Sequence, residues 1–284
     1  MIERIFHLHA LSALHVGTGQ SVGVVDLPIA RARATNLPLV PGSAIKGVLR
    51  DDLQLDLADK ITLFGPESTA DSGHAGAIAV GDAHLLILPI RAFSGIVAFA
   101  TCPFILARYG RDTGLSFEPL KLADDQAATP DDSTLPLDGK VLLEDLDLKA
   151  LAKDTATAAN QWAEEIAKRL HPDDEDWQAL FKQHFVILPD SIFSFLADTA
   201  TEIRARIKID DATRVVQRGA LWYEENLPAE SVLWGVIGIS KARDKSGKMA
   251  EELAALLPGK PLDLQIGGKH TVGRGLCRLV VKGA

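Results

Sequence analysis

The order of strand-like and helix-like segments is the feature that most constrains this fold. Residues 2–14 alternate loosely between apolar and polar side chains, which predicts a first strand with one wetter face. After a stretch punctuated by Gly and Pro, SAIKGVLRDDLQLDLADK places apolar residues at helical spacing from Ser43 onward. Residues 77–110 then predict two strands and a short helix that Pro103 begins.

The C-terminal part of the chain is again mostly strand-like. Residues 202–240 alternate as strands do, with turn-like interruptions at Asp210–Asp211 and Gly219. KMAEELAALL predicts a helix, and the strands LDLQI and LCRLVVK follow it. The whole order predicts an α+β fold with a ferredoxin-like βαββαβ core that carries large insertions.

Residues 110–201 interrupt that core. Their first part, with ADDQAATPDDSTLPLDGK, is acidic and lacks an apolar period, which predicts a loop or insertion. Residues 149–184 predict helices with a break at Pro172. The side chains expected to be buried there are Trp162, Ile166, Leu170, Trp177, Leu180 and Phe181. We therefore expect one domain over the whole chain, with its core in 1–109 and 202–284.

Composition limits the function classes. A net charge of −8 over 284 residues argues against polyanion binding by the whole surface, although local basic stripes remain compatible with it. The only thiols, Cys102 and Cys277, lack the spacing of a disulfide framework or a zinc site. The N-terminus lacks the order of a signal peptide, and the uncharged stretch from Ala92 to Ala107 is too short to span a membrane. We expect a soluble cytoplasmic protein.

The loop GGKHTVGRG, from Gly267 to Gly275, combines four glycines with Lys269 and Arg274. Glycines let backbone amides approach a phosphate, and the two cations would supply charge. A strand follows the loop, so it is neither a Walker loop nor a dinucleotide fingerprint. On composition alone, a tight connection between strands and a phosphate-binding loop are about equally good interpretations.

The predicted helix after Ser43 carries Lys46 and Arg50 one turn apart. Such a pair is usually a solvated face. The entry PGSAIKG favours the functional interpretation, because free amides at a helix start and a nearby lysine suit a phosphate.

His7 and His9 share a face of the first strand, but no carboxylate lies at a partnering spacing within it. A structural or hydrogen-bonding role is therefore the better prediction than a metal site. His15, just before a Gly-rich turn, is a candidate partner of Asp26.

Asp26 is the one acid in a Gly-rich, otherwise apolar stretch, and a turn or cap would explain it. Glu224 and Glu225 in WYEENLP are equally compatible with surface acids. Taken singly, each of these residues favours the structural interpretation.

Taken together, four segments resemble the RAMP superfamily of CRISPR proteins, and most closely the backbone subunit of type III-B (Cmr) effector complexes. The segments are LHVGTGQSVGVVDLPIAR, LPLVPGSAIKGVLR, GALWYEENLP and GGKHTVGRG, and they occur in the family's order between residues 14 and 275. The resemblance covers the core, whereas residues 110–200 are less characteristic.

The resemblance implies a modified RRM or ferredoxin-like fold that oligomerises head to tail along a guide RNA, beside other Cmr subunits. A β-hairpin thumb displaces bases between guide and target, and IDDATRVVQRGALWYEE is the candidate thumb. Guide binding is then expected from glycines and cations whose contacts are to phosphates. They are Lys46, Arg50, Gly267, Gly268, Lys269 and Arg274.

The resemblance also implies that complementary target RNA is cut at regular intervals with a divalent metal, Mg²⁺ or Mn²⁺. The family's essential acid lies in the loop matching SVGVVDLPIAR, and by that match it is Asp26. We expect Asp26 to serve as the catalytic and metal residue, with His15 and Glu224 or Glu225 as helpers.

Three alternatives stay open at this point. One is a noncleaving guide-RNA scaffold, because an aspartate in the right loop is necessary without being sufficient. Another is the corresponding backbone subunit of type III-A (Csm) complexes, although VGVVDLPIAR and GALWYEENLP favour type III-B. A guide-processing nuclease with histidine-centred chemistry is disfavoured by the acidic balance and the thumb-like segment.

Overall fold

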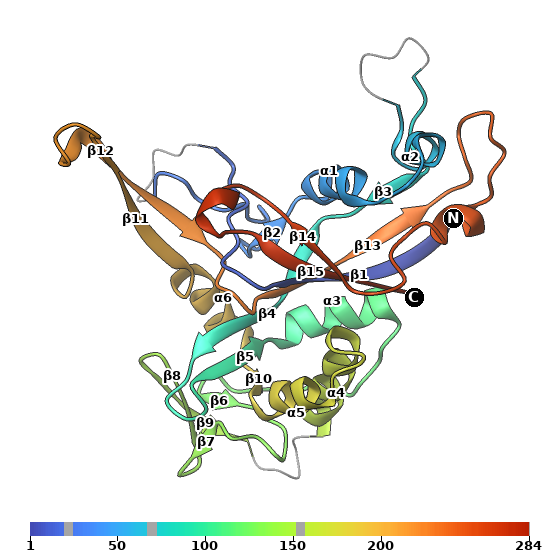
Figure 1. Ribbon diagram of the computed structural model, residues 1–284. Coiled ribbons are helices and arrows are strands. Elements are labelled where there is room, and N and C mark those ends of the chain that lie inside the picture. Colours follow the sequence, from blue (N-terminus) through green and yellow to red (C-terminus); the bar gives the residue numbers. More distant parts are fainter. Residues whose placement is uncertain (20–24, 67–72, 152–156, 284) are drawn as a thin grey trace.

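The computed structural model describes residues 1–19, 25–66, 73–151 and 157–283 (Figure 1). Within these ranges, one nine-stranded sheet forms the centre, in the order β10-β5-β4-β13-β1-β15-β14, with β2 beside β4 and β3 beside β13. Its strands are β1 (Ile2–Ala10), β2 (Leu39–Val40), β3 (Ile78–Val80), β4 (Ala83–Arg91), β5 (Val97–Thr101), β10 (Phe185–Ile187), β13 (Val232–Ile239), β14 (Leu262–Gln265) and β15 (Leu276–Gly283).

The centre of this sheet runs β15-β1-β13-β4, and each neighbouring pair is antiparallel. Helix α1 (Gly42–Asp52) lies between β1 and β4 in the sequence, and α7 (Ala250–Ala254) lies between β13 and β15. In Figure 1, α1 lies on one side of the sheet and α3 (Pro103–Thr113) on the other. The mixed α+β class predicted from the sequence is confirmed.

The segment predicted to be helical from Ser43 to Lys60 begins as α1, which buries Ile45 and Leu49 as its spacing requires, but the helix ends at Asp52. Its first residue, Gly42, donates its backbone N–H to Asp82 Oδ1 at 2.8 Å. A Cβ at Gly42 would lie 2.2 Å from the carbonyl oxygen of Val80, so the helix can pack this closely only with glycine there. Helix α2 (Leu57–Phe64) follows, capped by the side chain of Asp56.

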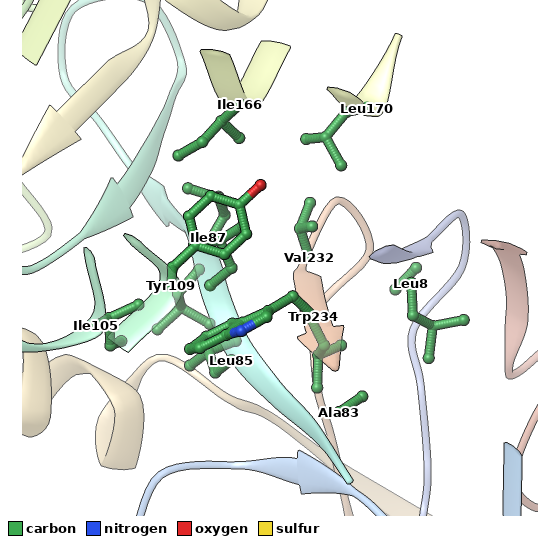
Figure 2. Close-up of a cluster of buried hydrophobic side chains, with 14 of the residues drawn as sticks. Leu8, Ala83, Leu85, Ile87, Ile105, Tyr109, Ile166, Leu170, Val232 and Trp234 are labelled. Atoms are coloured by element: carbon green, nitrogen blue, oxygen red, sulfur yellow. The ribbon is translucent and has the colours of Figure 1, made fainter. Parts of the chain in front are cut away.

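A buried aromatic cluster joins the sheet to α3, which begins at Pro103 as predicted (Figure 2). The rings of Tyr109 and Trp234 meet edge to face, with centroids 5.6 Å apart. Tyr109 also shares a 2.7 Å hydrogen bond with His7 Nε2. The predicted wetter face of the first strand is therefore wrong, since His7 and His9 are both buried. Their predicted hydrogen-bonding role is confirmed, and it offsets the cost of burying them.

Residues 110–201 contain more strand than predicted. A second sheet, in the order β6-β9-β8-β7, occupies part of the segment expected to be a loop. Its strands are β6 (Gln126–Ala127), β7 (Pro136–Leu137), β8 (Lys140–Leu143) and β9 (Leu146–Ala150). Strands of two to five residues are too short for an alternating pattern to be recognised, which explains the error.

The predicted helical region divides into α4 (Thr157–Leu170) and α5 (Glu175–Gln183), with α6 (Asp190–Thr199) following. The break at Pro172 is confirmed. Trp162, Ile166, Leu170 and Phe181 are buried as expected. Trp177 and Leu180 were predicted to be buried, but they are 42% and 37% exposed, because α5 buries only the side that carries Phe181. No helix in the described ranges is long and apolar enough to cross a bilayer.

Strands β11 (Glu202–Ile209) and β12 (Val216–Asn226) form a separate hairpin that projects from the body (Figure 1). The predicted turn at Asp210–Asp211 lies at its tip. Gly219 is not at a second turn, because it lies inside β12, where the pairing register shifts and its φ is +77°.

Candidate nucleic-acid interface and catalytic loop

The loop that carries Asp26 lies along β12 at the root of the hairpin. Leu27 forms a parallel bridge with Glu224, and its backbone N–H donates to the carbonyl oxygen of Tyr223 at 3.1 Å. The backbone N–H of Glu225 donates back to the carbonyl oxygen of Leu27 at 3.0 Å. The loop is therefore attached to β12 by a single bridge, while residues 20–24 of the predicted segment lie outside the described residues.

Asp26 is exposed and partly bonded. Its Oδ2 accepts a 2.7 Å hydrogen bond from the backbone N–H of Tyr223. Among the described residues, none donates to Oδ1. One carboxylate oxygen is thus held by the hairpin while the other remains available to solvent or a ligand.

His15 is attached to the same strand edge as Asp26. Its Nδ1 lies 2.7 Å from the carbonyl oxygen of Glu225, and a carbonyl only accepts, so Nδ1 carries the proton. The neutral ring then has its lone pair on Nε2, where it can accept a proton. Within the described ranges no hydrogen bond joins His15 to Asp26. Their partners, Glu225 and Tyr223, are two residues apart on β12, so both side chains approach one edge of that strand.

Glu224 is ionised and paired in a buried position. Its side chain is 2% exposed, and its Oε1 lies 2.9 Å from Lys269 Nζ and 2.8 Å from Trp222 Nε1. Arg206 Nε is a third partner at 3.7 Å. Burial by itself raises the pKa of Glu224, but the hydrogen bonds from Lys269 and Trp222 outweigh it and hold the pKa below its usual value.

Glu225 is also fully engaged. Its Oε1 accepts from Arg31 Nη2 at 2.6 Å and from Thr201 Oγ1 at 3.1 Å. Its Oε2 accepts from the backbone N–H of Ile29 at 3.0 Å. Arg31 and Thr201 are site residues that the sequence did not single out, because they lie 194 and 24 positions from Glu225.

The C-terminal glycine loop packs against His15. Gly268 donates its backbone N–H to the carbonyl oxygen of His15 at 2.9 Å. A Cβ at Gly267, where φ is +82°, would lie 2.3 Å from that oxygen, so glycine is required. The structure thus brings Gly267, Gly268 and Lys269 to the hairpin root beside His15. Arg274 contributes a buried Nε that has no partner among the described residues.

Lys46 and Arg50 form a separate basic group on α1. Burial lowers the pKa of Lys46, and the neighbouring charges of Arg50 and Arg243 lower it further. Lys46 and Arg243 line a hollow of about 370 Å³ together with His74. Among the described residues, none carries a carboxylate that pairs with Lys46, Arg50 or Arg243. This basic group therefore favours an anionic ligand. Arg243 was missed, although it lies in the basic run KARDKSGK.

No group of three or more His, Cys, Asp and Glu side chains in the described ranges forms a ready metal cage. At the hairpin root, Glu224 and Glu225 are occupied by cationic partners, which leaves Asp26 as the acid with a free oxygen. One carboxylate suits a hydrated divalent ion that takes its other ligands from water and phosphate. Asp26 could therefore supply one ligand to such an ion.

Comparison with known proteins defines the class first. Residues 7–278 match the RAMP superfamily, and the chain belongs to this superfamily. The match includes both the Asp26 loop and the glycine loop, which meet at the hairpin root.

Within the superfamily, the relatives point to one branch. The CRISPR system Cmr endoribonuclease Cmr4 of Pyrococcus furiosus is 34% identical over 295 residues, covering 97% of this chain and 94% of that protein. The crystal structure of oligomeric Cmr4 from Pyrococcus furiosus has a TM-score of 0.75 at 28% identity, covering 100% of this chain and 99% of that chain. The chain is therefore a member of the Cmr4 family.

A second CRISPR endoribonuclease is similar over a shorter segment. The CRISPR system Cms endoribonuclease Csm3 of Methanothermobacter thermautotrophicus is 41% identical over 58 residues, which are 19% of this chain and 23% of that protein. The full-length match to Cmr4 favours the type III-B assignment over the type III-A alternative.

Proposed function

We propose that this chain is the guide-RNA-binding backbone subunit of a type III-B CRISPR effector complex and cleaves complementary target RNA at regular intervals. Asp26 carries the proposal, because it is exposed at the root of a projecting hairpin and held there by the hairpin's own backbone. The full-length likeness to a Cmr endoribonuclease supports the same activity. We place the complex in the cytoplasm, with no membrane partner.

The proposal assigns parts of the fold to roles. The order β15-β1-β13-β4, with a helix in each half, supports a modified RRM or ferredoxin-like core. The β11–β12 hairpin is the thumb that enters between guide and target. We treat the chain as one RAMP domain with its core in 1–109 and 202–284, and 110–201 as its insertion.

Two basic regions are proposed to hold the guide. Lys46 and Arg50 on α1 have no carboxylate partner in the described ranges and would neutralise phosphates. The second region is the glycine loop, with Gly267, Gly268, Lys269 and Arg274. The Gly268 amide already bonds His15 and Lys269 already pairs with Glu224, so Arg274 is the residue proposed to bring free charge to the backbone of the same strand. Because such contacts are to phosphates, binding should not depend on guide sequence.

The proposed reaction uses the 2′-hydroxyl of the target as nucleophile. Its oxygen bonds to the adjacent phosphorus while the bond to the 5′ oxygen breaks. The 5′ oxygen takes a proton from water, so the products are a 2′,3′-cyclic phosphate and a 5′-hydroxyl. We assign the hydroxyl proton to Nε2 of His15, the ring nitrogen that does not bond Glu225. His15 is only 5% exposed, so the target must reach this nitrogen at the hairpin root itself. Displacement of one base by the thumb would splay the strand and align the attack.

Asp26 is the residue proposed to hold a divalent ion, Mg²⁺ or Mn²⁺, through its free oxygen. When bound, such an ion supplies charge stabilisation at the phosphate. Glu224 and Glu225 are assigned positioning rather than chemical roles, because each carboxylate is buried and already bonded.

The proposed protein partners are other Cmr subunits and head-to-tail copies of this chain. One face of the thumb supports self-assembly, since it exposes an apolar row that nothing in the described parts of the chain covers. Cross-strand pairing puts Ile207 opposite Leu221 and Ala205 opposite Tyr223 on that face.

The deciding experiment assembles this chain with a guide and its partner subunits, then adds end-labelled complementary RNA with Mg²⁺, Mn²⁺ or EDTA. A regular ladder of products that EDTA abolishes would support the nuclease. A target with 2′-deoxy residues at the cut positions should resist cleavage at those positions only. A target that stays intact with either metal would instead support the noncleaving scaffold.

A further inference from the structure

The guanidinium of Arg31 joins three separate parts of the chain. Its Nη2 donates to Glu225 Oε1 on β12 at 2.6 Å, and its Nη1 donates to Asp198 Oδ1 at 3.0 Å. Both nitrogens also donate to the carbonyl oxygen of Ala197 at 3.1 Å. That carbonyl belongs to the last turn of α6, where helix carbonyls lack intrahelical partners. Arg31 itself ends the loop that carries Asp26.

Glu225 completes the connection from the other side. Its carboxylate receives Arg31, the backbone N–H of Ile29 and the hydroxyl of Thr201. Thr201 immediately precedes β11, and Glu225 lies opposite Ile203 in the hairpin pairing. One carboxylate therefore ties the Asp26 loop to both strands of the thumb at their root.

The geometry of this pair suits positioning. The side chains of Arg31 and Glu225 are 16% and 7% exposed, so the pair is largely shielded from solvent. A planar guanidinium fork sets direction as well as attraction, which suits a positioning role. Asp26 is three residues from Ile29, a span of at most about 10 Å, so a shift at Ile29 reaches the acid.

We infer that Arg31 and Glu225 are the positioning residues that fix where the target is cut relative to the thumb. They hold the Asp26 loop, the end of α6 and both thumb strands as one unit, so the acid meets the same phosphodiester at each displaced base. This inference rests on the proposed nuclease function.

The test compares Arg31→Met with Arg33→Met in the assembled complex. Arg33 is an exposed arginine two residues further along, and among the described residues its side chain makes no hydrogen bond or ion pair. Single-turnover cleavage is followed with products resolved to one nucleotide. Arg31→Met should lower the rate about 100-fold, as expected when a reacting group shifts by about 1 Å, and should add cuts at neighbouring phosphodiesters. Target affinity should not change, and Arg33→Met should cut only at the parent positions.

Two further variants separate positioning from folding. Arg31→Lys keeps the charge without the fork, so it should recover part of the rate while extra cut positions persist. Thr201→Val removes one hydroxyl contact to Glu225 and should add weaker extra cuts. If the Arg31→Met complex does not assemble, this variant tests whether the contacts of Glu225 fix the cut position. Slower cleavage at unchanged positions in these variants would overturn the inference. An assembled parent complex that leaves the target intact would overturn the nuclease proposal and this inference with it.

Discussion

The carboxylate of Asp26 accepts a 2.7 Å hydrogen bond from the backbone of Tyr223, although the two residues are 197 positions apart in the chain. The bond leaves one oxygen of Asp26 unbonded by the described residues and fixes the other to the thumb. The acid and the element proposed to displace a base are therefore parts of one local structure.

Asp26→Asn should abolish most cleavage while the complex still assembles. The amide oxygen can still accept from Tyr223, so the loop keeps its place, whereas the negative charge is lost. We expect the single-turnover rate to fall by at least about 100-fold, with guide and target affinity unchanged. Unaltered metal-dependent cleavage in this variant would remove Asp26 from the chemistry.

Lys269→Met should lower the free energy of unfolding at neutral pH. It should also reduce how much that free energy falls as the pH is lowered. Loss of one charged partner, with Trp222 and Arg206 remaining, should cost about 1–3 kcal/mol at neutral pH. The lowered pKa of Glu224 contributes stability that is present above its usual value of 4.5 and is lost as pH falls below it. Urea unfolding at pH 7 and pH 3.5 measures both effects. In a Glu224→Gln background, Lys269→Met should no longer alter the pH dependence.

His7 should weaken the protein as pH falls below 6.5. Burial, with help from the charges of Arg169 and Lys282, lowers the pKa of His7 to about 3. Only the unfolded chain then binds a proton between pH 6.5 and 3, so stability falls by about 1.4 kcal/mol per pH unit there.

His7→Gln should remove about 2 kcal/mol of that loss between pH 6.5 and 5, as measured by urea unfolding. An equal slope in the His7→Gln and parent proteins would contradict a buried neutral His7.

Leu221→Asp should block self-assembly without unfolding the chain. Leu221 is 55% exposed on the apolar face of the thumb, so a charge there costs little in the monomer and much in a dry contact. Light scattering over a concentration series, with a thermal melt of each sample, measures both properties. Thr213→Asp at the hairpin tip is the control and should assemble like the parent. Assembly of Leu221→Asp at parent concentrations would exclude this face from the interface.

Lys46→Met should weaken binding to every guide sequence to a similar extent. Loss of one phosphate contact should also reduce the slope of log affinity against log salt by about 0.7. Arg243→Met is expected to act alike, since Arg243 shares the hollow beside Lys46. Lys121, exposed in the loop after α3, provides the control variant Lys121→Met. A loss confined to one guide sequence would argue for base contacts instead.

The local patterns of the sequence determined much of the fold. Ile45 and Leu49 at helical spacing predicted α1, and Pro103 predicted the start of α3, because a helix face and a helix start depend on neighbours within a few residues. The resemblance of four segments led to the family, since each segment keeps its residues together in the chain.

Only the tertiary structure decided what those segments do to one another. It buried His7 beside Tyr109 of α3, left Trp177 exposed, and paired the carboxylate of Glu225 with the guanidinium of Arg31. It also placed the Asp26 loop against β12. These outcomes depend on contacts between residues far apart in the chain. The periodicity of a segment predicts which of its faces is buried, but not which other segment packs against that face. The acid, its histidine neighbour and the thumb lie together because bridges from Leu14 to Leu227 and from Leu27 to Glu224 attach their segments to the end of β12.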